Sequence, residues 1–349
     1  MKFRAAFIIP ALIAFGTVAA ARTDKRKDKD CPQQVERTIA TDARVLVSLC
    51  LVSGDITVHG WDRNEVRARS NDASQIELRR RGTATESSPA TKLDVLITDQ
   101  ADGLARPDSC QAFSDLQLDV PRGATVQLQT RDGDVSVVDV ATAYVNTQSG
   151  DISVQQISRA VDAGSIGGDI SLKDSNGRVN LHSISGSVEA INVRFADSGD
   201  AFEASSVSGD ITLERVTHTQ LNAHTVSGTL NMSGPLAHGG RYGFKTLSGD
   251  VTLTLPADAS FQLSAKISQN GEIITDFPLT LMTVTSGSNA APPAPPAETG
   301  PKTPAPPKPG PRPALLAAYG LRRINAVHGG GDATIYLASF SGTLHLRKK

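Results

Sequence analysis

A six-residue phrase recurs through the chain and constrains its fold more than any other feature. It reads SGDITV at residues 53–58, SGDITL at residues 208–213 and SGDVTL at residues 248–253. Seven copies align on a glycine with spacings of 17, 18, 18, 23, 19 and 21 residues, and these glycines are Gly133, Gly150, Gly168, Gly186, Gly209, Gly228 and Gly249. A repeat of about 20 residues is typical of solenoid proteins, in which each copy is one structural unit.

Side-chain classes at fixed distances from each glycine predict two short strands per copy. The positions seven and five before the glycine and two and four after it are apolar, as at Val126, Leu128, Val135 and Val137 around Gly133. The residues between them are mostly polar, and this alternation is typical of a strand with one buried face. The position three before the glycine is always a hydroxyl residue: Thr130, Thr147, Ser165, Ser183, Ser206, Thr225 and Thr246.

Stacking of these units predicts an all-β fold, a single-domain β-solenoid (β-helix-like) built from repeats of roughly 17–23 residues. One unit cannot bury its apolar face alone, whereas stacked units bury a continuous core. The glycine is expected to turn a corner or to allow two backbones to approach closely. The neighbouring Asp or Ser is expected to bond to a nearby main-chain N–H group in an Asx-type turn.

The same pattern marks both edges of the repeat region. Gly54 has the apolar positions but Leu51 where a hydroxyl is expected, whereas Gly342 matches in full, with Ser339 at the hydroxyl position. Gly271 matches poorly. We expect the solenoid with its N-terminal capping strands at residues 41–285 and a final solenoid unit at residues 314–349. Between them, the proline density predicts a disordered insertion at residues 286–313.

The first residues predict export from the cell. Lys2 and Arg4 precede an apolar segment, and Ala19 and Ala21 form an A-x-A cleavage site, so residues 1–21 read as a signal peptide. Cleavage would leave Arg22 first and change the net charge from −1 to −3, because Lys2 and Arg4 are lost. A charged N-terminal arm is expected at residues 22–40. No later apolar run is long enough to span a bilayer, so we expect a location in the periplasm, at the cell surface or outside the cell.

Composition excludes several classes of partner. A balanced 20% of charged residues gives no electrostatic footprint for nucleic acid or an anionic membrane, and aromatic residues are only 4%. Cys31, Cys50 and Cys110 permit at most one intramolecular disulfide, and the spacing does not decide which pair forms it. None of them lies in a C-x-x-C motif, so the sequence indicates neither a redox motif nor a zinc knuckle.

At this level the chain resembles the bacterial putative-adhesin domain-of-unknown-function family. The resemblance rests on the SGD units, on LDVPRGATVQLQTRDGDVSV at residues 118–137 and on GGGDATIYLASFSGTLHLRKK at residues 329–349. It covers residues 43–349 apart from the proline-rich insertion. It implies an exported β-strand repeat with a β-helix-like fold and an envelope location, and it transfers no catalytic residue.

Two columns of polar side chains in the repeats could carry chemistry. The aspartates after the glycines could form a column that binds Ca²⁺, but turn chemistry explains them better, because calcium β-rolls have a nine-residue period. These aspartates are Asp55, Asp134, Asp151, Asp169, Asp210 and Asp250, with Ser187 and Thr229 replacing two in the middle of the repeat. The hydroxyl column is expected to be a hydrogen-bonded ladder, and no G-x-S-x-G motif occurs.

The seven histidines show no metal-ligand spacing, although His218 and His224 are close enough in the repeat to meet. HGGGD at residues 328–332 is similar to an esterase oxyanion loop, but no α/β pattern accompanies it. The sequence therefore predicts no catalytic, cofactor-binding or metal-ligating residue.

The sequence leaves two functions open. The first is a non-catalytic exported β-solenoid that acts as a structural or adhesin-like interaction surface of the bacterial envelope, and an envelope polymer or protein would be its partner. The alternative is a polysaccharide-acting β-helix enzyme, a lyase or hydrolase, of the periplasm. Such an enzyme needs a cleft with paired carboxylates, or with a basic residue near an acid, and a carboxylate cluster on one side of the stack. The candidates are Glu203, Glu214, Arg194 and Asp197.

Overall fold

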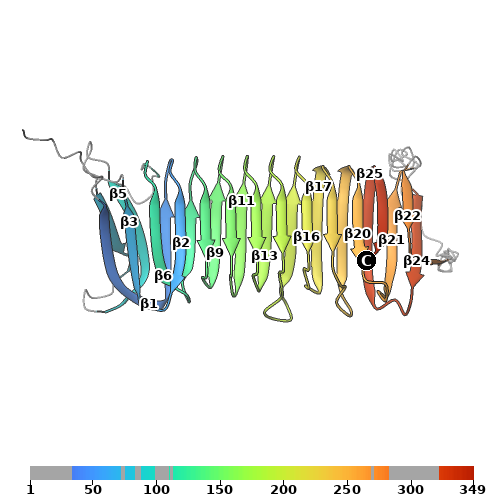
Figure 1. Cartoon of the computed structure of the whole chain (residues 1–349), viewed down its shortest axis with the longest axis horizontal. Coiled ribbons are helices and arrows are strands. Elements are labelled where there is room, and N and C mark those ends of the chain that lie inside the picture. Colours follow the sequence, from blue (N-terminus) through green and yellow to red (C-terminus); the bar gives the residue numbers. More distant parts are fainter. Residues whose placement is uncertain are drawn as a thin grey trace, which may run out of the picture. The chain divides into compact units, whose positions relative to one another are not determined.

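The computed structural model describes residues 34–71, 75–82, 88–98, 110, 113–268, 271–282 and 322–349. These residues form 26 strands joined in one hydrogen-bonded network, in which parallel pairing dominates, and no described residue is helical. The predicted all-β solenoid is therefore confirmed (Figure 1). Among the described residues there is no helix long and apolar enough to cross a membrane.

Each central coil of the solenoid contributes one strand to each of two sheets. In sheet B the central strands are β7 (Thr125–Gln129), β9 (Thr142–Thr147), β11 (Ala160–Ser165), β13 (Arg178–Ser183), β15 (Ala201–Ser206), β17 (Gln220–Ser227) and β19 (Arg241–Ser248). In sheet A they are β8 (Val135–Val138), β10 (Ile152–Gln155), β12 (Ile170–Lys173), β14 (Val188–Ile191), β16 (Ile211–Glu214), β18 (Leu230–Ser233) and β20 (Val251–Leu255). Equivalent residues of neighbouring coils pair directly, and Ile152 lies opposite both Val135 and Ile170.

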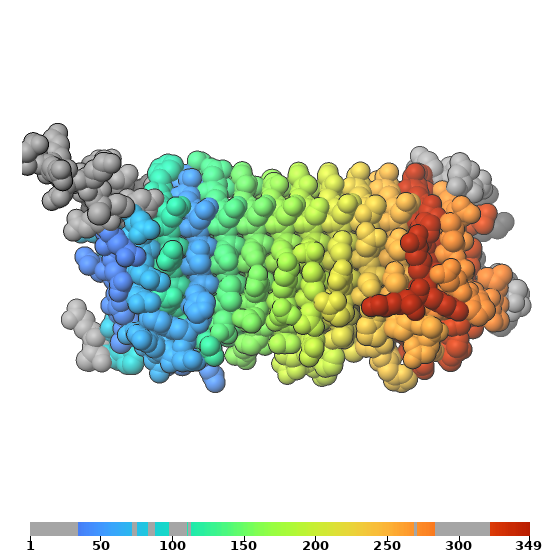
Figure 2. Space-filling view, viewed as in Figure 1, coloured from blue at the N-terminus to red at the C-terminus, as the bar shows by residue number. Residues whose placement is uncertain are grey.

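The first coil along the chain is not the first coil in space. The N-terminal strands are β1 (Val35–Cys50), β2 (Ile56–Trp61), β3 (Glu65–Ser70), β4 (Gln75–Arg80), β5 (Ala90–Thr98) and β6 (Leu116–Pro121). The C-terminal part of β1 pairs in parallel with β5 on one side and β7 on the other, and β2 lies likewise between β6 and β8. In the space-filling view the blue band of β2 accordingly lies between the bands of later segments (Figure 2).

The last coil is inserted in the same way. It consists of β25 (Ala333–Ser341) and β26 (Thr343–Lys348). The strands before it in the sequence are β21 (Phe261–Ile267), β22 (Glu272–Thr275), β23 (Thr280–Leu281) and β24 (Arg322–His328). β25 pairs in parallel with β19 and β21, and β26 pairs with β20 and β22. In Figure 1 the red strand β25 therefore lies between the strands labelled β20 and β21. Antiparallel strands close the ends, with β3 and β4 at one and β23 and β24 at the other.

One segment boundary expected from the sequence, the end of the charged N-terminal arm, differs from the structure. The charged arm was expected to reach residue 40, but β1 already begins at Val35 and pairs antiparallel with β3. The reason is apolar burial, because Val35 and Ile39 pack against the core. The signal peptide, residues 1–21, and the proline-rich insertion, residues 286–313, lie outside the described residues. They stay predictions.

The core contains the four expected apolar columns and a further one. The further column comes seven residues after the corner glycines and contains Val140, Ile157, Val193 and Val216, which are at most 1% exposed, with the buried Ser175 at the same position of the intervening coil. The residue before each of these five has a left-handed backbone, with φ between 49° and 63° at Asp139, Gln156, Asp174, Asn192 and Arg215. This conformation turns the chain after each sheet A strand and points the next side chain into the core.

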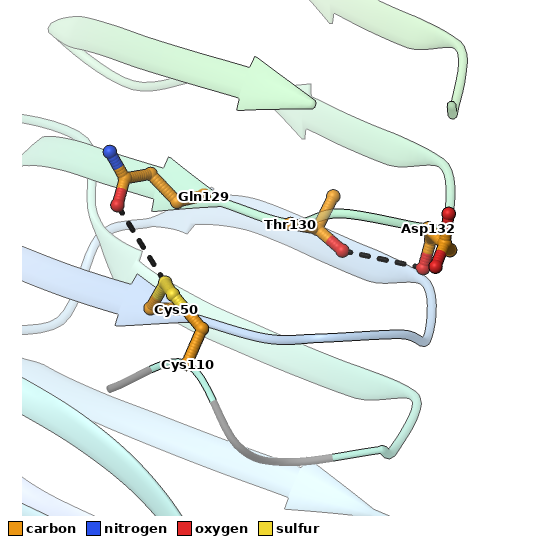
Figure 3. Close-up of a disulfide and its surroundings, with 5 residues drawn as sticks. All are labelled: Cys50, Cys110, Gln129, Thr130 and Asp132. Carbon is orange, nitrogen blue, oxygen red and sulfur yellow. Dashed lines mark hydrogen bonds between the residues drawn. A yellow bond between two sulfur atoms is a disulfide. The ribbon is translucent and has the colours of Figure 1, made fainter. Parts of the chain in front are cut away.

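A disulfide joins Cys50 in β1 to Cys110 in the connection between β5 and β6 (Figure 3). The two Cα atoms are 4.9 Å apart, and 60 residues separate the cysteines in the sequence. The bond holds Cys110 beside β1 in the inserted first coil. The sequence had left this pairing open among three cysteines.

Candidate binding groove

The corner glycines let neighbouring backbones approach closely. A Cβ atom built on Gly168 would lie 2.0 Å from the carbonyl oxygen of Gly150, and Gly186 and Gly209 stand in the same relation to the preceding coil. No side chain fits at that distance, so the close approach predicted from the sequence is confirmed. The glycine column is therefore part of the architecture.

The hydroxyl column forms the ladder that the sequence predicted. Ser165 Oγ accepts a hydrogen bond from the Gly168 N–H at 2.8 Å and donates one to the Gly150 carbonyl at 3.3 Å. Ser183 and Ser206 repeat both bonds one and two coils further on. These hydroxyls are buried and already bonded, which suits a structural role and not a nucleophile.

The aspartate column connects successive coils. Asp151 Oδ1 accepts the main-chain N–H of Asp169 at 2.8 Å, and Asp134 Oδ1 accepts that of Asp151 at 2.9 Å. The expected Asx-type turn within one coil is therefore wrong, because the carboxylate bonds the equivalent residue of the next coil. The same bond is donated by the N–H groups of Asp55, Asp134, Ser187, Thr229 and Thr343.

One corner of the stack has Ser114 where the others have glycine, so the alignment on glycines did not identify it. Ser114 lies against Gly54, where the other coils have glycine, and its N–H donates to the Ser53 carbonyl. Asp115 follows it, and its Oδ1 accepts the N–H of Asp55 at 2.9 Å. The aspartate ladder thus begins one coil before the first SGD phrase.

A long groove runs across the outer face of sheet A beside this ladder. Its volume is about 770 Å³. Its floor is a row of hydroxyl residues, Thr57, Ser136, Ser153, Ser171 and Thr212, and one side is the row Asp55, Asp134, Asp151, Asp169 and Asp210. We call this the sheet A groove. Because coils lie about 4.8 Å apart, the groove repeats its polar groups at that interval.

The charges that line the sheet A groove are mostly negative. Lys173 is the single cation among its lining residues, and its Nζ lies 3.6 Å from Glu189 Oε2. Ser171 Oγ donates to the same carboxylate oxygen at 3.3 Å. The groove therefore offers hydroxyl donors and carboxylate acceptors in a repeating row, which suits a ligand rich in hydrogen-bonding groups.

A second groove, of ≈ 520 Å³, follows the corner between sheet B and the glycine column. Gln129, Asn146 and His182 line one side of it, and Ile166 and Ile184 line the other. The Cys110 segment lies at its N-terminal end, where the disulfide holds it (Figure 3). The apolar side chains make this groove less polar than the sheet A groove.

The carboxylates proposed for an enzyme do not form one cluster. Glu203 lies in β15 on the outer side of sheet B, whereas Glu214 ends β16 in sheet A. Arg194 and Asp197 lie in the connection after β14, where the Asp197 N–H donates to Asp200 Oδ2 at 2.7 Å. These four residues therefore do not provide the carboxylate cluster that the enzyme alternative requires.

His218 and His224 do not meet. His218 is fully buried beside the Phe202 ring, 5.6 Å away between centroids, and its Nε2 lies 2.7 Å from the Gly177 carbonyl oxygen. Burial lowers the pKa of His218, and the Gly177 carbonyl and the Asp200 carboxylate oppose this shift only in part. His224 instead lies on the exposed side of β17.

The remaining histidine motif is a turn. Gly329 and Gly331 have φ angles of 65° and 76°, so HGGGD makes the tight connection between β24 and β25. His328 Nδ1 lies 2.9 Å from the Pro278 carbonyl oxygen, and His238 Nδ1 lies 3.7 Å from Asp332 Oδ1. Within the part of the chain that the structure describes, no three His, Cys, Asp or Glu side chains converge as a metal ion requires.

Comparison with known proteins places this β-solenoid in a family. The family model described as Toastrack DUF4097 matches residues 47–212 and 109–289, which together span more than half of the chain. The chain belongs to the Toastrack DUF4097 family, as the resemblance to a domain of unknown function led us to expect. None of the curated proteins compared with the chain matches it.

Two solved structures show a distant likeness. A putative adhesin from Parabacteroides distasonis ATCC 8503 is 10% identical, with 64% of this chain and 90% of that chain covered and a TM-score of 0.43. A putative adhesin from Bacteroides fragilis NCTC 9343 is 12% identical, with 90% and 97% covered and a TM-score of 0.38. These TM-scores are too low to identify a shared fold, so the family match alone establishes the relationship.

Proposed function

We propose that this protein is a non-catalytic, adhesin-like β-solenoid of the bacterial envelope that binds an extended polymer along the sheet A groove. The observation that carries the proposal is the repetition of one polar set, a hydroxyl and a carboxylate, on successive coils of the groove. A ligand with its own repeating polar groups can bond to several coils at once. Many weak contacts then add to a useful affinity.

The main-chain bonds of the aspartates keep this row rigid. Asp134 and Asp151 each accept an N–H through Oδ1, which fixes the orientation of the carboxylate, and a carboxylate has a second oxygen that can accept a bond from a ligand. A fixed binding group loses little conformational entropy when the ligand arrives. The structural bond and the proposed binding role are therefore compatible.

The equivalence of the aspartates is the argument against catalysis. General acid and base catalysis by two carboxyl groups needs different environments, so that one group is protonated while the other is ionised. Asp134 and Asp151 instead each accept the main-chain N–H of the equivalent residue one coil further on, and they hold the same place in successive coils. This uniformity favours binding over glycoside cleavage.

Export and an envelope location are supported by independent features. The first 21 residues have the pattern of a signal peptide, and the Cys50–Cys110 disulfide suits an oxidising compartment. Together these features favour a location outside the cytoplasm.

The test is binding of residues 22–349, with the disulfide intact, to an array of bacterial envelope polysaccharides. The Ser153→Leu/Ser171→Leu variant fills the floor of the sheet A groove, and Asn222→Leu on the exposed side of β17 is the control. We expect the floor variant to lose about tenfold or more in affinity, equivalent to about 1.4 kcal/mol, and the control to bind like the natural protein. The proposal would be contradicted if the protein bound no polymer on the array, if the floor variant bound as tightly as the natural protein, or if the protein released cleaved polymer.

A further inference from the structure

Six large apolar side chains form an exposed row at one corner of the stack. Each precedes its corner glycine by two residues, and each is between 41% and 54% exposed. They are Ile166, Ile184, Val207, Val226, Leu247 and Phe340, and we call them the apolar ridge. They make up six of the twelve exposed large apolar residues in the described part of the chain, so they are not randomly scattered.

Hydrogen bonds between coils make the apolar ridge continuous. The Ser185 N–H donates to the Ile166 carbonyl, and the Ser208 N–H donates to the Ile184 carbonyl, both at 2.9 Å. At the other end, the β19–β25 pairing places Leu247 and Phe340 on adjacent coils. Because coils lie about 4.8 Å apart, the six side chains form a straight row about 25 Å long.

We propose that the apolar ridge is the surface through which two copies of this chain pair, with their stack axes parallel. Contiguous apolar patches of this kind mark interaction sites. A second copy has the same spacing between coils, so each ridge side chain can meet its equivalent along the whole row. A surface with a different repeat would lose this alignment after a few coils.

Charges beside the ridge decide the orientation. Asp169, Asp210 and Asp250 lie on the glycine side of it, whereas His182 and Lys245 lie on the sheet B side. A two-fold axis along the ridge brings the aspartate side of each copy to the sheet B side of the other, where Lys245 lies beside the ridge. An antiparallel pair would bring the two aspartate rows together, which like-charge repulsion disfavours.

The available area fits a modest dimer interface. Six half-exposed apolar side chains present on the order of 400 Å², which is the size of a functional patch. The flanking Ser, His and Lys positions extend the contact toward the roughly 800 Å² per copy that a standard interface buries. This inference rests on the ridge alone and is independent of the proposed polymer binding.

The first test is the oligomeric state of residues 22–349 by sedimentation velocity over a range of concentrations. The variant Ile184→Thr/Val207→Thr/Val226→Thr makes the ridge polar at exposed positions, and Ile191→Thr in sheet A is the control. We expect the natural protein and the control to form dimers and the ridge variant to stay monomeric, with circular dichroism unchanged. A natural protein that is monomeric at every concentration, or a ridge variant that dimerises equally, would overturn the proposal.

A second test distinguishes the two orientations. Ile166→Cys is introduced together with Cys31→Ser, and the protein is oxidised and run on a non-reducing gel. The parallel pair brings both Ile166 positions to the same end, so a cross-linked dimer is expected. Cross-linking only between Ile166→Cys and Phe340→Cys in a mixture would overturn the parallel arrangement.

Discussion

The main-chain N–H of Asp169 donates a hydrogen bond to Oδ1 of Asp151, 2.8 Å away on the preceding coil. This bond explains why the SGD phrase is repeated, because the aspartate of one copy satisfies a main-chain donor of the next. The glycine allows the two backbones to approach, and the hydroxyl residue bonds main-chain groups on two coils. The phrase is therefore a unit of assembly, and its outward-facing groups remain available for binding.

Removing one carboxylate tests the aspartate ladder. Asp151→Ala leaves the Asp169 N–H without its partner and should lower the free energy of unfolding by about 1–2 kcal/mol. Asp151→Asn keeps an acceptor and removes one charge from a row of like charges, so its stability should stay close to that of the natural protein. Urea unfolding measures both, with the exposed Asp258→Ala as the control. Equal stability of all three variants would show that the ladder contributes nothing.

Adding a single methyl group tests the close approach of the coils. Gly168→Ala places a Cβ atom 2.0 Å from the Gly150 carbonyl oxygen, so we expect a loss of about 3 kcal/mol or more. Gly199→Ala is the matched control, because no atom lies within 4 Å of its Cβ position. Thermal melting compares the two variants. Similar melting temperatures would contradict the packing of the glycine column.

His218 should make stability depend on pH. Its pKa is lowered in the folded protein, chiefly by burial, so the unfolded chain takes up a proton more readily. Stability is therefore fully present above the unfolded pKa of about 6.5 and is lost as pH falls through the folded pKa. We expect the melting temperature of His218→Gln to fall less than that of the natural protein between pH 7 and the acid range. Parallel curves for the two proteins would be inconsistent with this role.

The disulfide should stabilise the N-terminal coils. Cys110→Ser releases the β5–β6 connection from β1 and should cost about 2–4 kcal/mol, because the bond closes a long loop. Cys31→Ser removes the cysteine outside this pair and should leave the melting temperature unchanged. Calorimetry under oxidising and reducing conditions measures the difference. If reduction had no effect on the natural protein, the bond would have no stabilising role.

The sequence predicted the coils well because their pattern is local. Apolar residues such as Ile152 and Val154 alternate with polar ones, and the hydroxyl at Thr147 recurs at a fixed distance from Gly150. Each coil thus specifies its own two strands and corner. The buried hydroxyl ladder followed from the same columns.

The order of the coils in space could not be predicted in this way. All coils have the same register and spacing, so the pattern does not state which coil pairs with which. The insertion of β25 between β19 and β21 depends on contacts between distant segments. The corner at Ser114 was missed because it lacks the glycine used for alignment. The apolar ridge was missed because the position two before each glycine was not among the positions compared.

The central claim is that the sheet A groove binds a polymer over many coils. The most direct measurement is the affinity of residues 22–349 for fragments of increasing length from the polymer that the array identifies. Asp55 and Asp210 lie five coils apart in the stack, which is about 25 Å. We predict that affinity rises with fragment length up to about this span and then levels off. Equal affinity for the shortest fragment and the full polymer would contradict the account.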